Sequence, residues 1–289
     1  MAFQKFKPEV WSAKFMEDLD KTLVFKEDCN HSYEGEAKQA GDAVRIFGLG
    51  DVEIGAWHHG KLETLPNAKE VTGHSILMPI NEVRYFNFEV GDDLDKAQAM
   101  GGSGLMGKFT SKTKDNMADV IDQFIAGLHV GNCAKAFNSD AALTADPTNS
   151  SATYILDAID DAYLKLLENN VSRNTKVTLT APPWFIMMLK RAYVELDTDN
   201  SAMLANGRVG RYGGITLKES NNVYTDGSGH SHIQLKTDEA IAFVNPYTHM
   251  EGYRPDLTFI DCVKGYTLFD GMVVAPKQVI DLNVYKYTA

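Results

Sequence analysis

Residues 101–108 (GGSGLMGK) have the glycine spacing of a phosphate-binding loop. Gly102, Gly104 and Gly107 match the dinucleotide pattern GxGxxG, and the stretch that ends at Lys108 matches most of the nucleotide pattern GxxxxGK. Such loops bind phosphate where a buried strand leads into the glycines and a helix follows them. Here the preceding residues, DDLDKAQAM, are acidic and helical in pattern, and phenylalanine stands where Ser or Thr would bind magnesium. The pattern therefore favours a flexible break in a long helix over a nucleotide site.

Histidine and cysteine are the other residues whose spacing could bind a metal. His58 and His59 are adjacent, so in a strand they point to opposite faces and do not easily share an ion. His230 and His232 could lie on one face, but no third ligand is evident. The three cysteines are far apart and form no CxxC pair, which argues against a zinc site and fits a reducing compartment. We therefore expect no catalytic residue, no cofactor and no metal, and surface positions for both histidine clusters.

Composition limits the remaining function classes. The chain has 289 residues, 44% of them apolar, which suits one large globular domain or two smaller ones. Its net charge of −11 argues against holding DNA or RNA by counterion release, although an acidic wall is compatible with enclosing packed nucleic acid. The longest strictly apolar run is about five residues, so no segment is expected to span a membrane. The N-terminus is not a signal peptide, because no apolar run follows its lysines.

The hydrophobic pattern changes between helical and strand periods along the chain, without a strict alternation, which favours an α+β fold. Residues 8–28 are predicted to form an amphipathic helix, and residues 42–90 read mostly as strand with a polar excursion at 58–75. The other predicted elements are an interrupted long helix at 91–132, a linker at 139–150, a helix at 151–170, a buried strand followed by a second helix at 176–196, a short strand within 207–224, and strands at 239–245 and within 251–287.

The region that begins at residues 33–60 has long strands with too little apolar surface to make a core of its own. A ribbon of this kind is marginal in water unless something covers it. The rest of the sequence offers no obvious cover and no convincing active site. We therefore expect another copy of the same protein to cover the ribbon, which indicates an assembly protein.

Several segments in order along the chain support that expectation. In order and spacing they resemble the major capsid proteins of tailed bacteriophages, which have the Hong Kong 97-type fold. The resemblance covers nearly the whole chain and rests on PEVWS at 8–12, SYEGEAKQAGDAVRI at 32–46, RYFNFEVGDDLDKAQA at 84–99, NGRVGRYGGITLKESNNV at 206–223 and EGYRPDLTFIDCVKGYTLFDGMVVAPKQV at 251–279.

The resemblance implies an architecture with an arm, an extended β-hairpin loop and two domains. The peripheral domain would contain a long spine helix, and the axial domain would meet its copies at the centres of hexamers and pentamers. The implied boundaries are residues 1–41 for the N-terminal arm, 42–84 for the extended loop, 85–149 and 251–289 for the peripheral domain, and 150–250 for the axial domain.

The resemblance implies a structural protein and not an enzyme: a subunit that assembles into the icosahedral shell of a virion and encloses double-stranded DNA without binding it specifically. The implied partners are further copies of the chain, a portal protein, a separate scaffolding protein and a decoration protein, with assembly in the bacterial host cytoplasm and no membrane. Some members begin with a cleaved scaffolding extension, whereas this chain starts almost at the arm, so we expect separate scaffolding or a mature product. Two alternatives stay open: an encapsulin-type nanocompartment, which shares the fold, and a nucleotide-binding enzyme that uses the 102–108 glycine loop.

The residues expected to contact neighbouring subunits lie in the arm and the extended loop. Some members crosslink neighbours through a loop lysine, and two lysines lie in that region here, although lysine is ordinary in a polar loop. The predicted contact residues are Trp11, Phe15, Tyr33, Trp57, Lys61 and Lys69. The predicted hinge residues are Gly101, Gly102 and Gly104.

Overall fold

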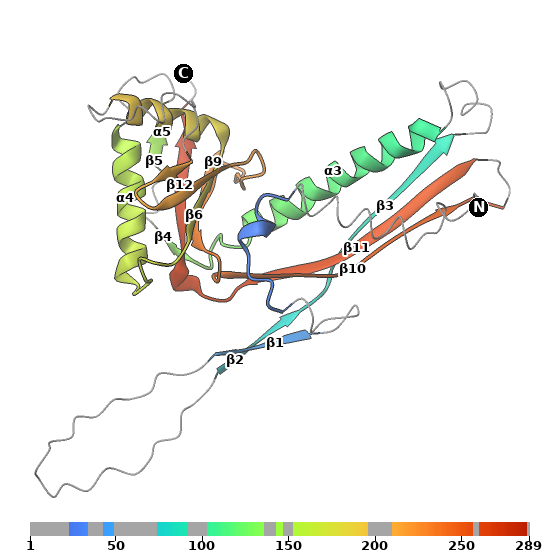
Figure 1. Ribbon diagram of the computed structural model, residues 1–289, viewed down its shortest axis with the longest axis horizontal. Coiled ribbons are helices and arrows are strands. Elements are labelled where there is room, and N and C mark those ends of the chain that lie inside the picture. The colour runs from blue at the N-terminus through green and yellow to red at the C-terminus, as the bar shows by residue number, and fades with distance from the viewer. Residues whose placement is uncertain are drawn as a thin grey trace, which may run out of the picture.

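The computed structural model describes residues 23–33, 43–48, 74–91, 103–135, 143–146, 153–195, 210–256 and 260–287 (Figure 1). The helices in these ranges are η2 (Lys26–Asp28), α3 (Ser103–Gly127), α4 (Thr153–Glu168), α5 (Pro183–Glu195) and η3 (Pro276–Gln278). The strands are β1 (Ala43–Gly48), β2 (His74–Pro79), β3 (Glu82–Gly91), β4 (Ala134–Lys135), β5 (Leu143–Ala145), β6 (Val177–Ala181), β7 (Arg211–Tyr212), β8 (Ile215–Glu219), β9 (His230–Thr237), β10 (Ile241–Tyr253), β11 (Asp261–Val273) and β12 (Val279–Lys286). Helices and strands are mixed, which confirms the predicted class at this level.

One of the two halves of the folded molecule is a seven-stranded sheet with α4 and α5 on one face (Figure 1). Its strands follow the order β4-β12-β9-β6-β8-β7, and β5 also pairs with β12. Helix α4 forms here because its apolar residues recur at helical spacing, and Ile155, Ile159 and Leu166 are fully buried against the sheet. Helix α5 begins at Pro183, where a proline costs no backbone hydrogen bond.

The other half of the folded molecule is a three-stranded antiparallel sheet, in the order β10-β11-β3, with α3 lying along it (Figure 1). Strands β10 and β11 have 13 residues each, and α3 has 25. These lengths match, since both correspond to about 40 Å. Ile121 and Ile125 of α3 pack with Val263 and Phe269 of β11 in one apolar cluster.

Strands β1 and β2 form a separate antiparallel ribbon whose inner face is covered by the same chain. Val44, Ile46 and Met78 pack with Val244 and Leu268 of the three-stranded sheet. The expectation that nothing in this chain covers the base of the ribbon is therefore wrong. The cover could not be found locally, because it is supplied by strands about 200 residues further along the chain.

Four local predictions also need correction. The predicted break at residues 101–108 is wrong from Ser103 onward, because α3 is continuous there and contains Gly104 and Gly107. These residues are helical, so they are not the phosphate-binding loop that the nucleotide-enzyme alternative requires. The predicted linker contains β5, and His230 begins a strand, β9, in a region for which no element was predicted. Of the predicted helix at 8–28, the described end is a 3-10 turn, Lys26–Asp28.

Candidate assembly surfaces and the polar joint

The outer face of the β1–β2 ribbon is open to solvent and carries apolar side chains together with Arg45 and Ser75. Alternation along the strands places Phe47 and Leu77 on the face opposite to Val44 and Ile46, with 78% and 56% of their surfaces exposed. The register pairs Phe47 with Ser75 and Leu77 with Arg45, so Phe47 and Leu77 are diagonal neighbours. Two large apolar side chains thus share one exposed face of a two-stranded ribbon, which is a surface suited to a further layer of protein.

The three-stranded sheet has an open face of its own beside the ribbon. Its register aligns His249, Tyr266 and Tyr85 in a row across three strands, and Tyr85 is 81% exposed. The His249 and Tyr266 rings lie 6.0 Å apart. In the next row Lys264 forms an ion pair with Glu251 at 2.6 Å. This face continues the one on which the ribbon packs, so the two open surfaces are neighbours.

A layer of polar side chains, here called the polar joint, lines the face of the seven-stranded sheet that is opposite to α4 and α5. It contains His232, Gln234 and Lys236 of β9, Asp281 of β12 and Lys218 of β8. The β9 and β12 members are buried, whereas residues between them in these strands, such as Ile233 and Leu282, point toward α4 and α5. Gln234 donates to the carbonyl oxygen of Ile125, which is how this face of the sheet contacts α3. The joint therefore links the two halves of the molecule through hydrogen bonds and ion pairs.

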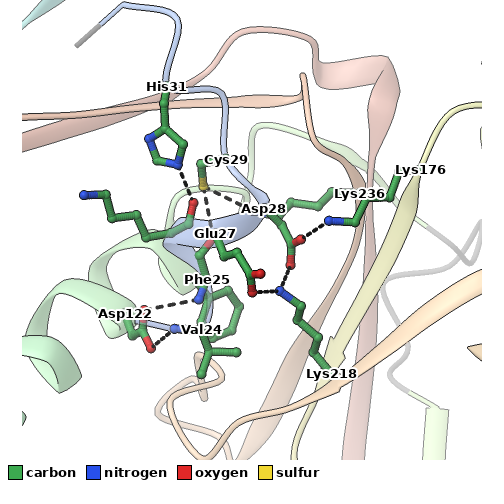
Figure 2. Close-up of polar contacts among 11 residues, drawn as sticks. Val24, Phe25, Glu27, Asp28, Cys29, His31, Asp122, Lys176, Lys218 and Lys236 are labelled. Atoms are coloured by element: carbon green, nitrogen blue, oxygen red, sulfur yellow. Dashed lines mark hydrogen bonds and ion pairs between the residues drawn. The ribbon is translucent and has the colours of Figure 1, made fainter. Parts of the chain in front are cut away.

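Residues 23–33, here called the N-terminal clip, lie between the two halves (Figure 2). Phe25 is buried in the cluster around α3. The Asp122 carboxylate of α3 accepts hydrogen bonds from the backbone N–H groups of Val24 and Phe25, at 3.1 and 3.2 Å. Asn30 exchanges backbone hydrogen bonds with β10, donating to Ile241 O at 2.8 Å. The clip is thus fixed to the half of the molecule that contains α3.

Asp28 fixes the other side of the clip to the seven-stranded sheet. Its carboxylate is buried and meets Lys218 at 2.7 Å and Lys176 at 2.9 Å, and Glu27 also pairs with Lys218 (Figure 2). Burial acts to raise the pKa of Asp28, but hydrogen bonds from Lys218 and Lys176 outweigh it and hold that pKa below its usual value. Asp28 is therefore the charged residue that ties the clip to β8.

The Cys29 thiol completes the contact between the clip and the joint. Lys236, which is 1% exposed, donates to Cys29 Sγ at 3.3 Å. Burial raises the pKa of Cys29 despite the neighbouring ammonium group. A buried thiol that stays protonated is unreactive, so this cysteine is a packing residue and not a nucleophile.

Most of the predicted contact residues lie outside the described ranges. Trp11, Phe15, Trp57, Lys61 and Lys69 are among these, as are Gly101 and Gly102 of the predicted hinge. Tyr33 is described, and it packs partly buried against the cluster beneath the ribbon. Gly104 lies inside α3. Phe47 and Leu77 were missed, although the alternation of Val44 and Ile46 with their neighbours is the signal that could have found them.

For the pair His230 and His232, the predicted surface position is wrong at His232. His232 is 8% exposed, because it lies in a central strand and pairs with Asp281. Across the described ranges, no group of three or more His, Cys, Asp or Glu residues is arranged to hold a metal ion. No helix in those ranges is long and apolar enough to cross a bilayer.

The chain shares its fold with proteins of phage capsids. No family model and no curated protein sequence matches it. Among solved structures it is similar to a chain from Mycobacterium phage Che8, with 22% identity, 90% of each chain covered and a TM-score of 0.72. It is also similar to the capsid of the cyanophage P-SCSP1u, with 13% identity, 92% of this chain and 89% of the other covered, and a TM-score of 0.67. A virus-like particle from Pyrococcus furiosus matches with 11% identity, 96% and 99% coverage and a TM-score of 0.53.

These likenesses run along nearly the whole chain, so they concern the complete arrangement of sheets and helices and not a shared motif. They confirm the Hong Kong 97-like capsid fold that the sequence segments indicated.

Proposed function

We propose that this chain is the major shell subunit of a tailed-phage capsid. It assembles through hexamers and pentamers into an icosahedral shell in the host cytoplasm and becomes part of the virion. The observation that carries the proposal is the outer face of the β1–β2 ribbon, where Phe47 and Leu77 are exposed on a fold shared with phage capsids. An apolar face of this kind is stable in water when a neighbouring copy covers it.

The physics of shells fits such a surface. A closed shell needs heterologous contacts, in which one patch of a subunit meets a different patch of the next. Each contact can be weak, because a subunit held by several neighbours gains avidity. In this proposal the arm (1–41) and extended loop (42–84) supply these contacts, while the peripheral domain (85–149 and 251–289) and axial domain (150–250) form the rigid tile. The hinge of this proposal is Gly101 and Gly102, which precede Ser103 in the sequence, with Gly104 in the first turn of α3.

The proposed contents are compatible with the charge of the chain. A net charge of −11 argues against holding DNA by neutralising its phosphates, so in this proposal the shell encloses double-stranded DNA without specific contacts. Scaffolding, portal and decoration proteins are the further partners of this proposal. The second candidate, a nanocompartment, is supported by the likeness to the Pyrococcus particle, but that TM-score of 0.53 is lower than the 0.72 and 0.67 of the phage chains. Nuclease-protected DNA in particles from infected cells supports the capsid, and packaged protein with no DNA contradicts it.

Shortening the loop tests the assembly role while keeping the folded base. Gly48 pairs with His74, so residues 49–73 can be replaced by Asn-Gly, a two-residue turn that closes an antiparallel hairpin. The inner face of the ribbon and its packing on β10 and β11 are retained in this variant. We expect a folded protein by circular dichroism that forms no shells in negative-stain electron microscopy. Normal particles from this variant would show that the loop is not an assembly element.

A pair of leucine substitutions tests the exposed face itself. Leu77→Ser removes an apolar side chain that is 56% exposed on the ribbon, and Leu164→Ser makes the same change at a 52% exposed site on α4. Because both side chains are exposed, each change should alter the stability of the subunit little. We expect Leu77→Ser to raise the protein concentration needed for particle formation well above that of Leu164→Ser. Equal effects, or a larger effect at Leu164, would contradict the assignment of the ribbon face.

A further inference from the structure

Two histidines share one buried carboxylate where the end of α3 meets the polar joint. His129, in the turn after α3, lies with Nε2 3.3 Å from Asp281 Oδ1. His232 of β9 lies with Nδ1 2.9 Å from Asp281 Oδ2. All three side chains are buried, and His129 is completely inaccessible. This cluster joins three segments of the fold: the C-terminal turn of α3, β9 and β12.

Gln234 determines which nitrogen of His129 carries its proton. The Gln234 Nε2 group donates to Ile125 O at 3.0 Å and to Ala126 O at 3.2 Å, so its orientation is fixed by two acceptors. The same nitrogen lies 2.8 Å from His129 Nδ1. Because Nε2 of the amide is a donor, Nδ1 of His129 must be an acceptor. The proton of His129 is therefore on Nε2, from which it is donated to Asp281.

The geometry sets the consequence of a further proton on His129. Its Nε2 already donates to Asp281, so the added proton would lie on Nδ1, where it would point at the Gln234 amide donor. To accept it, Gln234 has to turn away from Ile125 O and Ala126 O, the carbonyl groups at the end of α3. A proton at His129 Nδ1 is therefore incompatible with the contact that Gln234 makes between β9 and α3.

Among the described residues, other ionisable groups face or lie near the cluster. From the segment before β9, Tyr224 lies with its ring 5.7 Å from that of His232, and the Asp226 carboxylate interacts electrostatically with His232. On α3 itself, Asp122 lies two turns before His129 and binds the clip. Burial acts to raise the pKa of Asp281, but hydrogen bonds and charge from the two histidines hold it below its usual value, so the shared carboxylate stays ionised.

We propose that His129, His232, Asp281 and Gln234 form a proton-operated latch between α3 and the seven-stranded sheet. The latch is closed at neutral pH and opens when His129 takes up a proton. Its opening frees the end of a 25-residue helix from β9, so acidification loosens the connection between the two halves of the subunit. This inference concerns the single chain and stands apart from the proposed assembly role.

Hydrogen exchange measured by mass spectrometry tests the latch on the full chain, free or in particles. Between pH 7.5 and 4.5, the range in which imidazoles gain protons, protection of the amides of Leu128, Val130 and Asn132 should fall relative to that of α5. The opening equilibrium gains up to about tenfold per pH unit for one proton taken up. The test variant is His129→Gln, whose amide can still donate to Asp281 but cannot titrate. In this variant the loss of protection on acidification at residues 128–132 that the latch causes should be absent.

The matched control is His230→Gln, the same change at a partly exposed histidine outside the cluster. It should keep the wild-type pH dependence at residues 128–132. Any response caused by Asp122 persists in both variants and is thereby separated from the latch. The same pH dependence in wild type and His129→Gln, or constant protection down to pH 4.5, would overturn the proposal.

A second measurement is independent of whether His129→Gln folds. Solid-state NMR of the ¹⁵N-histidine-labelled wild type at pH 7.5 should show His129 as the Nε2–H tautomer. An Nδ1–H tautomer there would remove the basis of the latch.

Discussion

Replacing Asp28 by asparagine should lower the free energy of unfolding by about 2 kcal/mol, whereas replacing the adjacent Glu27 by glutamine should change it by less than about 0.5 kcal/mol. Both residues lie in η2 and both pair with Lys218, but the side chain of Asp28 is 1% exposed and that of Glu27 is 71% exposed. Removing one partner of a fully buried ion pair costs roughly 3–5 kcal/mol. We expect about 2 kcal/mol for Asp28→Asn, below that range, because Lys176 is half exposed and Lys218 keeps Glu27 as a partner. Both lysines therefore remain partly satisfied.

The assay is a urea titration followed by far-UV circular dichroism, at a protein concentration where light scattering detects no particles. The pKa of Asp28 is held below its usual value, so its contribution is complete at neutral pH and is lost as the pH falls below about 4. The difference between wild type and Asp28→Asn should therefore shrink in that range. Equal effects of the two substitutions at pH 7 would refute the reasoning that burial of Asp28 holds the clip in place.

Two further predictions concern α3 and the sheet beside it. Gly265→Ala should destabilise the chain by about 1–3 kcal/mol in the same assay, because a Cβ there would lie 2.5 Å from Phe86 Cζ and 2.6 Å from His249 O. Gly252→Ala, where the nearest atom is 3.9 Å away, is its control and should cost less than half as much. Burial raises the pKa of Asp122 to about 6, so its contribution to stability is greatest below pH 4 and is lost as the pH rises through 6. The stability of wild type relative to Asp122→Asn should thus fall by up to about 3 kcal/mol from pH 4 to pH 8, and a rise would contradict the burial argument.

The parts of the fold that depend on local pattern could be predicted from the sequence. Helix α4 was expected at 151–170 because its apolar residues recur at helical spacing, and it forms from Thr153 to Glu168. Strand β6 and helix α5 were expected within 176–196 for similar reasons. Strand β9 was missed because His232, Gln234 and Lys236 make it look like a polar turn. These side chains are buried because their partners, such as Cys29 for Lys236, lie as many as 207 residues away in the sequence.

The same distance in sequence limited the prediction of the candidate site. Val44 and Ile46 indicated that the ribbon would have an apolar face. Nothing in the local pattern indicated that β10 and β11 would bury this face. The pattern therefore placed the expected assembly surface on a face that the chain itself covers. In our proposal Phe47 and Leu77 on the outer face carry that role, and the contacts predicted for Trp11, Trp57 and the other residues outside the described ranges stay predictions.

Electron cryomicroscopy of particles formed by the full chain would show whether the outer face of the ribbon is an interface between copies. We predict closed shells in which Phe47 and Leu77 of each copy are covered by a neighbouring copy. A chain that stays unassembled at all concentrations, or a shell in which this ribbon face remains open to solvent, would contradict this prediction.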